Sequence, residues 1–163
     1  MKRTLAAVAP GLWLLAACSP TPTLRASWTG SDTGKAVLRA RAALCGEQGP
    51  LLIFAASGDT GIGLAVYPNG SLGAGVYPIF DASHGVVRPG AAVAARWTRA
   101  MVMADLRGDQ GQLTLDAAAP AAAGHFSVRM TGAAAMSAAI AMEGSFKGIP
   151  VVAGGPDCVA QSR

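Results

Sequence analysis

Three side chains with the chemistry of a hydrolase lie within four positions of one another: Asp81, Ser83 and His84. A serine nucleophile needs a base that takes its proton and a third group that orients the base. Neighbouring residues of one loop rarely reach that geometry, and Ser83 lacks the G-x-S-x-G context of a nucleophile elbow. We therefore expect a polar loop, and a hydrolase that uses it is an alternative function.

Two further sets of residues lack the surroundings that their chemistry needs. Asp59-Thr60-Gly61 matches the tripeptide of aspartic proteases, but Ser57 and Gly58 precede it where apolar flanks would be needed. His84 and His125 are the two histidines of the chain, and their spacing suggests no further metal ligands. We predict a turn at Asp59, no catalytic residues, no metal site and no cofactor.

The start of the chain has the pattern of an export signal. Lys2 and Arg3 precede an apolar run from Leu5 to Ala17, which is shorter than the roughly 20 residues that span a bilayer. The run ends in Leu15-Ala16-Ala17-Cys18.

This end resembles the lipobox of bacterial lipoproteins, with leucine and two small residues before the cysteine. The resemblance implies that residues 1–17 are a cleaved signal helix and that Cys18 carries fatty acyl chains such as palmitate. Two or three chains would anchor the protein permanently. Ser19 fits the default of that family, the periplasmic face of the outer membrane. Residues 18–23, rich in Pro and Thr, would then be a tether, and residues 24–163 a single domain.

Two cysteines remain once Cys18 is assigned to the anchor. Cys45 and Cys158 lie near the two ends of the mature domain. An exported protein matures in an oxidising compartment, where an even pair favours a disulfide. No C-x-x-C or H-x-x-x-H spacing supports the alternative of a metal site.

Composition excludes two classes of protein. The apolar fraction is 52% and the charged fraction 13%, so the chain is not disordered. The net charge of +4 falls by half without Lys2 and Arg3, and the other basic residues are scattered. We therefore expect no nucleic-acid partner, because such a surface needs clustered basic residues.

Short alternating segments separated by Gly, Pro and Asp predict an all-β fold, either an antiparallel β-sandwich or a flattened barrel. A hairpin is expected around Gly58-Asp59, and a second one that runs from 91–106 through a turn at Arg107–Gly111. Pro78 suggests an edge strand or the end of a strand. Helices at 91–104 or 132–143 are the alternative for the Ala-rich runs.

Binding residues are expected among the aromatic and basic side chains. Trp28, Trp97, Tyr67 and Tyr77 either fill the core or line a concave face. Arg39 and Arg41 share one outward strand face, where they are solvated or contact lipid phosphates.

The sequence therefore predicts a non-enzymatic, lipid-anchored envelope protein that binds a small ligand or an envelope protein at the membrane surface. Alternatives are a small periplasmic hydrolase that uses the Asp81–His84 loop, and an accessory subunit whose sheet edge pairs with an envelope complex.

Overall fold

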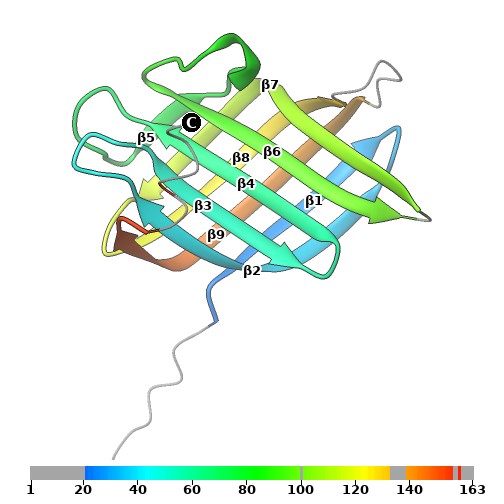
Figure 1. The fold of residues 1–163 in the computed structure, drawn as a ribbon, viewed down its shortest axis with the longest axis horizontal. Helices are drawn as coiled ribbons and strands as arrows, with labels where there is room; N and C mark the ends of the chain where they lie inside the picture. Colours follow the sequence, from blue (N-terminus) through cyan, green and yellow to red (C-terminus); the bar gives the residue numbers. More distant parts are fainter. Residues whose placement is uncertain (1–20, 100, 133–138, 156–157, 159–163) are drawn as a thin grey trace, which may run out of the picture.

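Antiparallel strands make up most of the computed structural model, which describes residues 21–99, 101–132, 139–155 and 158 (Figure 1). The predicted signal helix and Cys18 lie outside these residues. The strands are β1 (Thr23–Gly30), β2 (Gly34–Leu44), β3 (Leu51–Ser57), β4 (Thr60–Tyr67), β5 (Gly75–Pro78), β6 (Gly90–Arg99), β7 (Val102–Ala117), β8 (Ala121–Gly132) and β9 (Ala139–Ala153). A single 3-10 turn, η1 (Ala82–His84), interrupts the loop between β5 and β6.

The strands close into a barrel. Antiparallel pairing follows the order β7-β6-β4-β3-β2-β1-β9-β8, and β8 pairs back with β7. In Figure 1, β3, β4 and β6 form the near wall, and β8, β9 and β1 the far wall. The all-β prediction is confirmed, and the barrel is the form found. Closure satisfies the backbone hydrogen bonds that a sandwich would leave at its edges.

Side chains fill the interior of the barrel, because alternate residues of each strand point inward. The inward positions are apolar, so the burial pattern alternates along β1, β6 and β8. Trp28 and Trp97 stack inside, with ring centroids 4.8 Å apart. The largest fully buried side chains are Leu24, Leu38, Leu51, Ile53, Ile62, Leu64, Leu106, Leu113, Leu115, Met130 and Met142 within the barrel, and Leu52 on its wall.

The segment 91–104 is strand, as predicted, but the second hairpin turns elsewhere. The turn lies between Arg99 and Val102, and Met101 there has a φ of +65°. The predicted turn at Arg107–Gly111 is wrong: this segment lies inside β7 as a bulge opposite β8. Gly-Asp pairs serve bulges as well as turns, and a Cβ at Gly108 would come within 2.7 Å of Val128.

In the second uncertain segment, residues 139–143 belong to β9, and residues 133–138 lie outside the described residues. None of the described residues forms a helix of the length and hydropathy that crossing a bilayer requires.

A disulfide joins Cys45, just after β2, to Cys158, beyond β9, with 5.4 Å between the Cα atoms. The predicted pairing is confirmed. Nearby, Ala42–Leu44 pairs in parallel with Val151–Ala153. The covalent bond therefore fixes Cys158 beside the loop that connects β2 and β3.

The segment between β4 and β6, which contains β5 and η1, folds over the outer wall, and we call it the long loop. Tyr67 packs there against Phe80, with centroids 5.7 Å apart. Arg88 lies over the Tyr67 ring and donates to the carbonyls of Gln48 and Pro68. This small apolar cluster outside the barrel gives the wall a raised border.

Candidate functional site

The predicted aromatic residues are mostly core residues. Trp28, Trp97 and Tyr77 are each at most 7% exposed, and the Tyr77 hydroxyl donates to the carbonyl of Gly73 at 2.8 Å. They stabilise the barrel from within, so they offer no surface to a ligand. Tyr67 differs, because its ring faces outward beneath the long loop.

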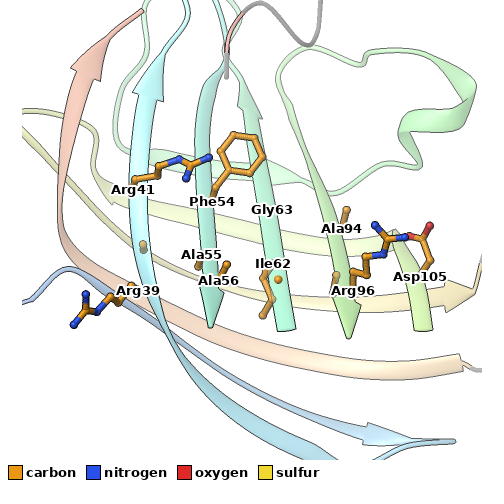
Figure 2. Close-up of a pocket in the computed structure, with 13 residues that line it drawn as sticks. Arg39, Arg41, Phe54, Ala55, Ala56, Ile62, Gly63, Ala94, Arg96 and Asp105 are labelled. Carbon is orange, nitrogen blue, oxygen red and sulfur yellow. The ribbon is translucent and has the colours of Figure 1, made fainter. Parts of the chain in front are cut away.

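A groove crosses the outer wall of the barrel instead. Its open part holds about 680 Å³ over β2, β3, β4 and β6 (Figure 2). A second hollow of about 300 Å³ continues it toward η1. The two share Phe54, Gly63 and Ala94, so they form one site, which we call the wall groove.

Strand register explains the shape of the wall groove. One row of directly paired outward residues crosses its mouth, and a second row crosses its middle. The mouth row is Arg39, Ala56, Gly61, Arg96 and Asp105, and the middle row is Arg41, Phe54, Gly63, Ala94 and Arg107. In the mouth row the central strands carry only Ala56 and Gly61, so the backbone is the floor there. In the middle row the Phe54 ring stands beside Gly63, between the two hollows.

The far end of the wall groove is apolar and partly enclosed. Leu52, Ala65 and Ala92 are the next outward residues of β3, β4 and β6, and Tyr67 follows. Ala82 and Ser83 of η1 line the same hollow. Gly61 and Tyr67 are six residues apart on β4, so the groove is about 20 Å long at roughly 3.4 Å per residue.

Positive charge borders the wall groove. Arg39 and Arg41 come from β2, Arg96 from β6 and Arg107 from β7, against one carboxylate, Asp105. The Arg41 guanidinium lies 5.5 Å from the centre of the Phe54 ring and leans over it (Figure 2). Arg96 donates to the sulfur of Met103. Among the described residues, Arg39 makes no hydrogen bond or ion pair, and its side chain extends into solvent, away from the groove floor (Figure 2).

The Asp81–His84 loop brings together the three residues of the alternative hydrolytic site. The Asp81 carboxylate lies between Ser83 and His84. Asp81 Oδ1 accepts from the Ser83 hydroxyl at 2.7 Å and from the Ser83 backbone N–H at 2.9 Å. His84 Nδ1 lies 3.4 Å from the other oxygen. A hydrolytic triad places histidine between serine and carboxylate. Here Asp81 caps the first turn of η1.

The cap should respond to loss of the serine hydroxyl. Two hydrogen bonds lower the pKa of Asp81 below its ordinary value. The bond from the Ser83 hydroxyl has the largest effect, and the bond from the Ser83 backbone N–H has the next largest. Because the folded-state pKa is the lower one, the stabilisation is full above the ordinary carboxyl range and is lost as pH falls through the lowered pKa. We expect Ser83→Ala to raise the pKa of Asp81 toward its ordinary value, as measured by carboxyl NMR titration. An unchanged pKa would contradict the cap.

The Asp59 tripeptide forms the β3–β4 turn, as predicted. A second copy, Asp32-Thr33-Gly34, connects β1 to β2. Asp32 accepts from Arg99 at 2.7 Å and from the Trp28 indole at 3.2 Å. Among the described residues, no hydrogen bond joins Asp32 to Asp59, and no group of three or more His, Cys, Asp and Glu is placed to hold a metal ion.

β5 is the edge strand that Pro78 suggested. It pairs with β7 along one side and covers four residues. Pro78 lacks an N–H, and so short a strand offers few backbone groups to a partner.

The wall groove was not predicted as a site, although Arg39 and Arg41 at its border were. Its floor consists mostly of small or apolar residues, and Arg96, Asp105 and Arg107 add charges from β6 and β7; these residues come together only once the strand register is known. Comparison of the chain with protein-family models, with curated proteins and with solved structures finds no match.

Proposed function

We propose that this protein is a non-enzymatic, lipid-anchored envelope protein whose wall groove binds a ligand at the membrane surface. The observation that carries the proposal is a continuous groove on a barrel whose interior is packed. Its volume falls in the range of ligand sites, about 300–1,000 Å³. Ligand binding on the outside leaves the packed core undisturbed.

The position at which the chain enters the barrel supports this proposal, because a lipid anchor on Cys18 would lie close to the groove mouth. The Pro22 carbonyl accepts from the Ala40 N–H at 3.0 Å, and Thr23 pairs with both Arg39 and Lys147. From Cys18 to Pro22 the chain spans at most about 14 Å. Acyl chains on Cys18 would therefore hold the mouth of the groove close to lipid headgroups, most simply on the periplasmic face of the outer membrane. Arg39 and Lys147 would be attracted to lipid phosphates there.

A photo-reactive side chain at the groove mouth tests the proposal in living bacteria. Ala56 is exposed on the groove floor, and Ser127 is exposed on β8 at the opposite wall, which makes it a matched control. We expect a light-dependent mass increase for the Ala56 variant and none for the Ser127 variant. The same intact-protein mass spectra should show a chain that begins at an acylated Cys18.

Two results would overturn the proposal. An unmodified Cys18 thiol would remove the anchor and the envelope location. Equal adducts at both positions, or none at Ala56, would remove the groove as the binding site.

A further inference from the structure

The wall groove has different chemistry at its two ends. The mouth row holds Arg39 and Arg96 against the single carboxylate of Asp105. At the far end, the hollow is lined by apolar residues, of which Leu52 and Tyr67 are buried and Ala65 is half-buried. A ligand that satisfies both ends must be negatively charged at one end and apolar at the other.

The fourth arginine does not alter this polarity. Arg107 lies on the η1 side of the groove, and its charge acts on Asp81, whose pKa it helps to lower. Arg107 therefore lies apart from Arg39 and Arg96, which line the mouth.

We infer that the occupant of the wall groove is an anionic amphiphile with a single alkyl or acyl chain, drawn from the membrane beside the protein. This inference rests on the proposed function. Its charged head lies at the mouth, where Arg39 and Arg96 border the groove, and its chain runs past Gly63 and Phe54 to the apolar end.

The dimensions of the groove agree with one chain. A bilayer core of about 30 Å gives each leaflet a chain length of about 15 Å. The groove is about 20 Å long at 3.4 Å per residue, which leaves room for a headgroup. Across the groove, β2 and β6 are three strand spacings, or about 14 Å, apart, so the chain lies between these two strands.

Arginine suits the head of such a ligand. Guanidinium groups bind phosphate and carboxylate oxygens through paired, charge-assisted hydrogen bonds. The Arg39 side chain is solvated and makes no contact with a partner among the described residues, so it is available to an anion. The mouth row continues from Arg39 through Thr23 to Lys147. Positive charge therefore extends toward the point where the chain enters the barrel.

The experiment uses the mature protein, purified in nonionic detergent, and a dodecyl phosphate that carries a photo-reactive diazirine on its chain. The phosphocholine with the same chain is the zwitterionic probe. We expect dodecyl phosphate to label β3, β4 or β6, and the phosphocholine to need at least about tenfold more for half-saturation, as loss of one charge-assisted contact predicts.

Matched variants separate the groove from general charge. Arg39→Gln with Arg96→Gln should raise the half-saturating concentration of dodecyl phosphate by about tenfold or more. Arg25→Gln with Lys35→Gln removes two charges from a different hollow and should leave it within about threefold. Ala65→Trp fills the apolar end and should abolish labelling there.

Each other outcome overturns the inference. Equal labelling by both probes, or equal loss in both double variants, would remove the anionic head. Labelling that persists in Ala65→Trp would remove the chain site. Tight labelling only after deletion of residues 159–163 would assign the groove to the chain's own C-terminal segment. If the Ala56 adduct found in bacteria is a molecule without an anionic group, the ligand class fails while the proposed function stands.

Discussion

Trp97→Ala is expected to lower the free energy of unfolding by about 3–5 kcal/mol. Trp97 is buried inside the barrel and stacks on Trp28, with ring centroids 4.8 Å apart. Removing the indole leaves a cavity. The strands cannot move inward to fill it, because each strand is hydrogen-bonded on both sides. Loss of the stacking contact adds to the effect.

Urea unfolding followed by far-UV circular dichroism measures this loss. Trp97→Phe is the control, since it keeps an aromatic ring and should cost clearly less than the alanine variant. Arg99→Ala tests the ion pair with Asp32 above the stack, and should cost under about 1 kcal/mol because that pair is exposed. An alanine variant as stable as the wild type would mean that the interior is not packed.

Removal of the disulfide is expected to have an effect of similar size. Cys45 and Cys158 are 113 residues apart in the sequence. Closing a loop of that order stabilises a protein by about 4–5 kcal/mol in the chain-entropy model, because it restricts the unfolded chain. The double variant Cys45→Ser with Cys158→Ser should therefore unfold at a markedly lower urea concentration.

Reducing agent provides the matched comparison for the disulfide. It should destabilise the wild-type protein to the level of the double serine variant and leave that variant unchanged. The loop after Cys45 also carries the Gln48 carbonyl that accepts from Arg88. Equal stability of oxidised and reduced protein would show that the cross-link contributes nothing.

Local patterns predicted the strands and the disulfide well. The alternation of apolar and polar residues in β1, β2 and β8 is plain, since period two distinguishes strand from helix. Even the Ala-rich β6 was recognised, because Val93, Ala95 and Trp97 share one face. Because the chain was expected to be exported, an even pair of cysteines left few alternatives to a disulfide.

Pairing between distant strands could not be predicted in the same way. Closure depends on β1 with β9 and on β7 with β8, and nothing in an alternating strand names its neighbour. The bulge at Gly108 was predicted as a turn because glycine and aspartate serve both, and here Asp109 pairs with Arg129 through two hydrogen bonds near 3.0 Å. The wall groove depends on register and was therefore hidden as well.

The closed ring of hydrogen bonds has a consequence for selectivity. A cleft between two domains can open and close around ligands of different width. The borders of this groove, β2 and β6, are three strand spacings apart, and they cannot separate without breaking backbone hydrogen bonds. Any adjustment to a guest must come from side-chain rotamers and from the loop that carries η1. The barrel therefore keeps the two borders of the groove at a constant separation, whichever guest lies between them.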